Sequence, residues 1–182
     1  VLNHLGRNLY RNFVTVLGEA ISNSWDADAN NVWIYMDREK SKLLVKDDGL
    51  GMSDEDFKSK FLKVGYSKRG NDGKLIKSPG GRPYIGRKGI GKLALLSCAK
   101  RVSIISKTSE NEYVGGIIDN SKLDNAITED STTYDLESIE INSFKPHIDN
   151  HARGTIILFE DIHEGIKKSE EYFRKTLALY FK

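Results

Sequence analysis

The stretch from Gly65 to Gly91 constrains the fold most, because its composition suits neither a helix nor a strand. It holds eight glycines together with Pro79, Pro83 and many lysines and arginines. A run of this length without regular structure inside a compact domain is usually a functional loop or a lid. We therefore expect a lid over about residues 65–91, with helices and strands on either side of it.

The residues on either side follow helical and strand periodicities in mixed order. Leu9, Phe13 and Val16 recur at helical spacing, in a segment that continues to about Asp26. The helices that the sequence predicts cover about residues 5–26, 53–62, 90–99 and 169–181. The predicted strands cover residues 32–37, 43–46, 101–107, 113–119, about 134–141 and 155–160. This order, with hairpin-like neighbours late in the chain, favours an α+β fold with one mixed, mostly antiparallel sheet covered by helices.

Glu19, Asn23 and Asp26 share one face of the first predicted helix, and Ala27 follows them. Glu19 and Asn23 are four residues apart, and Asp26 lies two turns after Glu19, so all three side chains return to the same side. Such a stripe is as consistent with a solvated helix face as with a binding site. The helix alone therefore leaves both interpretations open.

Asp47 and Asp48 end the second predicted strand, and Gly49, Gly51 and Met52 follow at once. Glycines at such a point allow a ligand to approach the backbone closely. A carboxylate there can accept a hydrogen bond from the exocyclic amine of adenine, whereas guanine presents a carbonyl at that position. A plain Asp-Gly turn would contain the same residues, so this motif also has two interpretations.

The segment from Gly86 to Lys92 is rich in glycine and runs into an apolar helical pattern. Backbone amides at a helix N-terminus form an anion site, and lysines add charge suited to a polyphosphate. The candidate phosphate contacts are Gly86, Lys88, Gly89, Ile90, Gly91 and Lys92. We reject a P-loop, because Leu93 stands where that motif has a Ser or Thr and no apolar strand precedes the segment. A flexible basic loop is the alternative.

The fourth motif, Arg153-Gly154-Thr155, indicates by itself only the start of a strand. In their order and spacing, however, the four motifs resemble those of the GHKL superfamily, which is named after gyrase, heat-shock chaperones, histidine kinases and MutL. The resemblance covers about Leu9 to Glu160. It implies the Bergerat fold, a two-layer α/β sandwich that holds ATP beneath a mobile lid.

The resemblance also implies a role for each candidate residue. Glu19 would be the general base that activates water, and Asn23 would coordinate Mg²⁺. Asp47 would bind the adenine amine, and Thr155 would support the adenine end of the site. The other nucleotide contacts would be Asp26, Ala27, Gly49, Gly51, Met52 and the candidate phosphate contacts of the Gly86–Lys92 segment.

Glu19 is typical of the hydrolysing members of the superfamily, since histidine kinases generally lack a glutamate four residues before the asparagine. The Asp47–Met52 motif resembles that of chaperones and MORC proteins, whereas the lid looks like that of uncharacterised bacterial members. We therefore expect a Mg²⁺-dependent ATPase whose slow hydrolysis drives a conformational switch, with ATP-dependent self-association of a larger protein. A nucleotide sensor without turnover and a histidine kinase catalytic domain are the alternatives.

Composition adds the remaining expectations. The formal net charge of +2 is too small to indicate nucleic acid or membrane by itself. No apolar run approaches the roughly 20 residues of a membrane span. The single cysteine, Cys98, has apolar neighbours that predict a buried thiol, and it suits a reducing compartment such as the cytoplasm. Because the chain begins at Val1 rather than Met, we expect an N-terminal fragment of a longer protein, whose client, DNA or protein, the sequence does not name.

Overall fold

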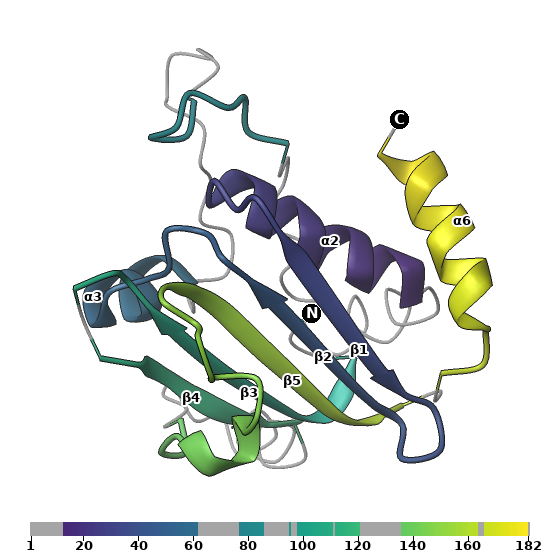
Figure 1. The fold of residues 1–182 in the computed structure, drawn as a ribbon. Helices are drawn as coiled ribbons and strands as arrows, with labels where there is room; N and C mark the ends of the chain where they lie inside the picture. The colour runs from purple at the N-terminus through teal and green to yellow at the C-terminus, as the bar shows by residue number, and fades with distance from the viewer. Residues whose placement is uncertain are drawn as a thin grey trace, which may run out of the picture.

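The computed structural model describes residues 13–61, 77–85, 95, 98–110, 112–120, 136–163 and 166–181. In this part of the chain, five strands form one sheet in the order β1-β2-β5-β3-β4, and every neighbouring pair is antiparallel. The strands are β1 (Val32–Asp37), β2 (Lys42–Asp47), β3 (Ala99–Lys107), β4 (Val114–Asp119) and β5 (Gly154–Ile162). The last strand in sequence thus lies at the centre of the sheet, beside β2 (Figure 1).

Helices cover one face of this sheet. They are α2 (Phe13–Asp26), α3 (Asp54–Asp56) with its π-helical continuation η1 (Phe57–Phe61), and α6 (Glu170–Tyr180). The Ser53 hydroxyl accepts a hydrogen bond from the Asp56 N–H at 3.2 Å and so caps α3, where the second helix is expected to begin. The expected α+β architecture, one antiparallel sheet covered by helices, is confirmed as well. No helix of the described residues is long and apolar enough to cross a membrane.

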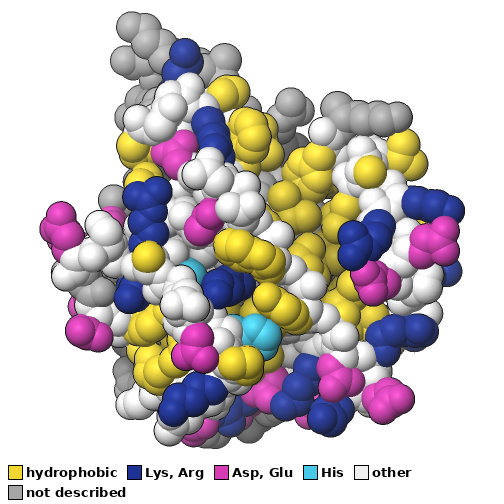
Figure 2. All heavy atoms as spheres, viewed as in Figure 1, with side chains coloured by type: hydrophobic (Ala, Val, Ile, Leu, Met, Phe, Trp, Pro, Cys, Tyr) yellow, Lys and Arg dark blue, Asp and Glu magenta, His cyan; other side chains and the backbone are white. Residues whose placement is uncertain are grey.

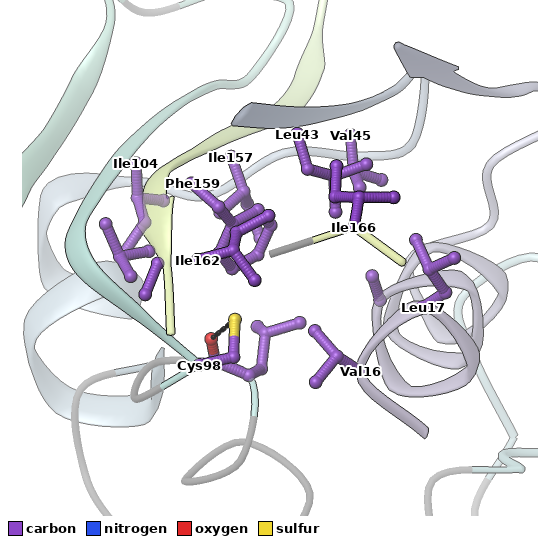
Figure 3. Close-up of a cluster of buried hydrophobic side chains, with 14 of the residues drawn as sticks. Val16, Leu17, Leu43, Val45, Cys98, Ile104, Ile157, Phe159, Ile162 and Ile166 are labelled. Atoms are coloured by element: carbon purple, nitrogen blue, oxygen red, sulfur yellow. Dashed lines mark hydrogen bonds between the residues drawn. The ribbon is translucent and has the colours of Figure 1, made fainter. Parts of the chain in front are cut away.

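Successive residues of the central strands point to opposite faces of the sheet, and both faces are apolar. Leu43 and Val45 of β2 face the helices, whereas Leu44 between them faces away. Figure 3 shows part of the larger core, where Val16 and Leu17 of α2 lie opposite the side chains of β2 and β5. The smaller cluster on the other face consists of Leu44, Ile105, Phe144, Ile156 and Leu158, with Tyr113, Ile139, Ile141 and Ile148 packed against it.

The expected strand over residues 134–141 is wrong for the residues that the structure describes. Within 136–140, Glu137 forms one isolated bridge with Ile117, and the 3₁₀ helix η2 (Ile141–Phe144) follows. The alternating apolar residues that suggested a strand are explained by packing, because Ile139 and Ile141 contact the smaller cluster. The expected helix over 90–99 lies mostly outside the described residues. Its expected end at Ala99 is wrong, because strand β3 begins at that residue.

Charged side chains of both signs are interspersed over the face drawn in Figure 2. This face therefore carries no broad patch of one charge. Electrostatics alone gives no reason to place a polyanion there.

Cys98 lies in the larger core, and only 4% of its surface is exposed. Its thiol donates to the Leu95 carbonyl oxygen at 3.3 Å, shown by the dashed line in Figure 3. Burial raises the pKa of Cys98 to about 12. The expected buried thiol is confirmed.

The folded protein should therefore react with a thiol reagent at pH 8 at least about 1,000-fold more slowly than the unfolded protein. Only about 10⁻⁴ of a thiol of pKa 12 is thiolate at this pH, against about 0.1 for a thiol of pKa 9, and the thiolate is the reacting species. Absorbance after addition of a disulfide reagent, with and without guanidinium, measures both rates. Equal rates would contradict the burial of Cys98.

Candidate functional site

The C-terminal half of α2 lies against the end of β2. Ser24 donates a hydrogen bond to Asp47 Oδ2 at 3.0 Å and also lies 3.1 Å from the Ala20 carbonyl oxygen. The Ala27 carbonyl, just after the helix, accepts from the Leu50 N–H at 2.8 Å. These contacts join the first two sequence motifs, which lie 20 or more residues apart, into one site.

Asp47 is the buried centre of this site, with 7% of its surface exposed. Its Oδ1 accepts from the Gly49 N–H at 2.9 Å and from the Thr155 N–H at 3.2 Å, while Oδ2 accepts from Ser24. Burial raises the pKa of the Asp47 carboxyl, and these three hydrogen bonds offset part of the rise. Each carboxylate oxygen accepts about two hydrogen bonds, so Oδ2 has capacity for one donor beyond those of the described residues.

Asp48, unlike Asp47, binds residues of the turn that follows α2. Its carboxylate accepts from the Asn30 N–H at 2.7 Å and from the N–H and side-chain amide of Asn31 at 2.8 Å each. Partial burial raises the pKa of Asp48, but the hydrogen bonds from Asn31 and Asn30 outweigh it, so the pKa is lowered overall. Asp48 thus closes the turn between α2 and β1, whereas Asp47 is directed toward α2 and β5.

Two glycines allow the strand ends to meet. Gly51 has a φ of +69°, and a Cβ there would lie 1.8 Å from the Lys107 carbonyl oxygen at the end of β3. Gly154 has a φ of +119°, and its Cβ would lie 2.1 Å from the Asp47 carbonyl oxygen. Any other residue at either position would require the backbone to move, because the obstacle is main chain in both cases.

A hydroxyl pair connects the Thr155 end of β5 to Met52. Ser106 Oγ lies 2.9 Å from Thr155 Oγ1, donates to the Gly154 carbonyl at 3.0 Å and accepts from the Met52 N–H at 3.0 Å. Thr155 and Met52 are half-buried. The structure therefore brings Asp47, Gly51, Met52 and Thr155 together, although Thr155 is about a hundred residues from the others.

Glu19 and Asn23 are half-buried and lie one turn apart on α2, each one position before a residue of the face that carries Ala20 and Ser24. Asn23 Nδ2 is buried and has no hydrogen-bond partner among the described residues. The two ends of an amide exchange by rotation, so a buried carboxamide without a partner can offer either its nitrogen or its oxygen. Within the described residues, no group of three acidic, His or Cys side chains could hold a metal by itself. One amide oxygen together with phosphates and water suits Mg²⁺, so Asn23 fits the role that the resemblance implies.

Of the expected lid, the structure describes residues 77–85, and these are fixed to the end of α2. Asp26 Oδ1 accepts from the Ile85 N–H at 2.9 Å, and Trp25 Nε1 donates to the Pro83 carbonyl at 3.0 Å. Asp28 accepts from the Ser78 hydroxyl and from the Gly80 N–H, and the Ser78 bond is the main cause of its lowered pKa. Asp26 thus holds the residue that precedes the glycine-rich segment.

The six candidate phosphate contacts lie outside the described residues. They are Gly86, Lys88, Gly89, Ile90, Gly91 and Lys92. Their roles, and a lid over residues 65–91, stay predictions.

Ser24, Ser106 and His151 also belong to the site, but the motifs did not identify them. His151 Nε2 lies 2.7 Å from the Asp47 carbonyl oxygen. Ser24 directly follows Asn23 on the helix and would be found from the 3.6-residue period, because it shares a face with Ala20 and Ala27. Nothing in the local sequence marks Ser106 or His151, since their partners come from distant strands.

Comparison with known proteins gives two matches. Residues 10–155 match the family described as "Histidine kinase-, DNA gyrase B-, and HSP90-like ATPase". The chain is also 33% identical over 180 residues to the protein named "Putative type II restriction enzyme HgiDII" from Herpetosiphon aurantiacus. That match covers 99% of this chain but 28% of the relative, so the chain spans about a quarter of the relative's length.

Proposed function

The chain belongs to the family of histidine kinase-, DNA gyrase B- and HSP90-like ATPases, an ATP-binding domain type, and we propose that it binds ATP with Mg²⁺ and hydrolyses it slowly. The observation that carries this proposal is the environment of Asp47. Ser24 of α2, Gly49 of the turn and Thr155 of β5 each donate a hydrogen bond to this buried carboxylate, and its Oδ2 can accept one more. Such a group is suited to the exocyclic amine of adenine.

Adenine and guanine differ at this point in the direction of the hydrogen bond. The amine of adenine donates to a carboxylate, whereas the carbonyl of guanine would face Asp47 oxygen to oxygen. Asp47 therefore supports a preference for ATP and ADP over guanine nucleotides. Losing a charge-assisted hydrogen bond costs about 1.5–3 kcal/mol, or roughly ten- to a hundred-fold in affinity.

The α2 stripe of Glu19 and Asn23 supports hydrolysis at the other end of the nucleotide. Asn23 would hold Mg²⁺, which would neutralise charge on the phosphates. Glu19, one turn earlier on the same helix, would orient a water molecule and accept its proton. A sensor without turnover needs no such carboxylate, so Glu19 favours an ATPase over a pure sensor.

We propose that this site works as a conformational switch of a larger protein in the cytoplasm, with ATP-dependent self-association. The relative is about three and a half times as long as this chain, which supports the presence of further parts. Because that relative is named "Putative type II restriction enzyme HgiDII", DNA is the first client that we propose to test. ATPase activity of the full-length protein with and without double-stranded DNA tests this, and equal rates would count against a DNA client.

This chain by itself should turn over ATP far below the typical enzyme median of about 10 s⁻¹. In the hydrolysing members that it resembles, a lysine from a following domain usually contacts the γ-phosphate, and withholding such a charge slows phosphoryl transfer by orders of magnitude. A steady-state phosphate-release assay, run beside analytical ultracentrifugation, measures turnover and association together. Turnover near 10 s⁻¹ from a monomer would show that one chain contains the whole active site.

A further inference from the structure

We propose that His151 is a positioning residue for adenine recognition, acting through the main-chain carbonyl of Asp47. This inference rests on the proposed function, because it assigns His151 to the same site. His151 comes from the segment between η2 and β5, which covers the face of the sheet opposite the helices. It is 5% exposed and lies outside the four sequence motifs.

The hydrogen-bonded pairing of β2 with β5 ends one residue before Asp47. The last paired residues are Lys46 and Ile156, so the Asp47 carbonyl has no strand partner on the β5 side. His151 Nε2 replaces that partner at 2.7 Å. The lack of a side chain at Gly154 makes room for the contact, because a Cβ there would lie 2.1 Å from the Asp47 oxygen and 2.9 Å from His151 Nε2.

The surroundings fix the proton on the imidazole. A carbonyl oxygen only accepts, so Nε2 carries the hydrogen, and Nδ1 of the neutral ring accepts from the Tyr113 hydroxyl at 2.9 Å. Burial lowers the pKa of His151, and the charges of Lys46 and Lys107 lower it further against the opposing contact with the Asp47 carbonyl. The Tyr113 ring also stacks on the imidazole at a centroid distance of 6.0 Å.

The bond from His151 fixes the peptide plane between Asp47 and Asp48. That plane sets the direction in which the Asp47 side chain leaves the strand, and so the fit of its oxygens to Ser24, Gly49 and Thr155. Without the bond, a buried carbonyl would lack a partner, and the end of β2 would rotate to find one. The carboxylate would then point less accurately at the amine of adenine.

Two substitutions at position 151 separate this role from general packing. Glutamine places its amide nitrogen about where Nε2 lies, whereas asparagine reaches only to Nδ1. The probes are ATP and purine riboside triphosphate, which lacks only the 6-amino group, and calorimetry gives both dissociation constants. Wild type should bind ATP roughly ten- to a hundred-fold more tightly than the analogue.

His151→Asn should reduce that ratio to within about three-fold of unity while the affinity for the analogue stays the same. His151→Gln should restore most of the ratio. His147→Asn is the matched control, because the His147 ring packs against Tyr35 in a tilted arrangement and no hydrogen bond to Asp47 is seen for it among the described residues. It should leave the ratio unchanged. A general loosening of the fold would instead weaken both nucleotides equally.

If wild type prefers ATP over the analogue as expected and His151→Asn shows the same preference, the role of His151 is overturned and the proposed function stays intact. No preference for ATP in the wild type would overturn the proposed function itself. If His151→Asn does not fold, Tyr113→Phe takes its place, since it removes the hydroxyl that holds Nδ1 but keeps the imidazole. Its ratio should fall about three-fold, and an unchanged ratio would overturn the proposal.

Discussion

Glu19→Gln should lower the rate of ATP hydrolysis by about 10²–10⁴-fold, the usual contribution of a general base. Glutamine preserves the size of the side chain but cannot accept the proton of the attacking water. Glu19 is half-buried on α2, one turn before Asn23 and away from the contacts that hold Asp47. ATP affinity should therefore stay within a few-fold of wild type.

Single-turnover hydrolysis and calorimetry measure the two effects separately. Glu171→Gln serves as the matched control, because Glu171 is an exposed residue of α6 whose carboxylate pairs with Lys175. It should change neither rate nor affinity. A Glu19→Gln protein whose turnover lies within a few-fold of the parent would remove Glu19 from the general-base role.

Asp47→Asn should weaken ATP binding by roughly ten- to a hundred-fold without disturbing the fold. The amide can keep the hydrogen bonds of the carboxylate, since Oδ1 still accepts from Gly49 and Thr155, and Nδ2 can donate to Ser24. Ser24 can then direct its own hydrogen to the Ala20 carbonyl. What is lost is the acceptor for the adenine amine, and the preference for ATP over GTP should disappear with it.

The same variant should be at least as stable as wild type at neutral pH. The pKa of Asp47 is raised in the folded protein, so the folded state binds a proton more readily than the unfolded state between the two pKa values. Ionised Asp47 therefore costs stability at pH values above its folded pKa, and the cost disappears as the pH falls below the ordinary value of 3.8. The difference in melting temperature should shrink over that range. A variant that is less stable than wild type at pH 7 and gains relative to it in acid would contradict this sign.

Strongly periodic segments were predictable because their periodicity follows from burial. The strands at residues 32–37 and 43–46 and the closing helix occur in the structure with nearly the expected bounds. The opening helix ends at Asp26 as expected, and its expected start near residue 5 lies outside the described residues. Residues 136–140 were assigned wrongly, because an alternating apolar pattern also fits an irregular segment that packs Ile139 and Ile141 on a sheet.

The contacts of the candidate site were predictable where one motif held both partners, whereas the roles that the resemblance implies stay predictions. Asp47 and its glycines are adjacent in sequence, but only the crossover that puts β5 beside β2 brings Thr155 to the carboxylate. His151 could not be found from the sequence, since a lone histidine after an irregular segment has no period to mark its direction. The attachment of residues 77–85 to α2 likewise depends on pairs such as Asp26 and Ile85 that are far apart in the chain.

Titration of the unmodified chain with ATP and with GTP, both with Mg²⁺, tests the central claim most directly. If Asp47 accepts a hydrogen bond from the adenine amine, calorimetry should show one ATP bound per chain, at least about ten-fold more tightly than GTP. Equal affinities for the two nucleotides, or no saturable binding of ATP, would contradict the claim that the end of β2 and helix α2 form an adenine-nucleotide site.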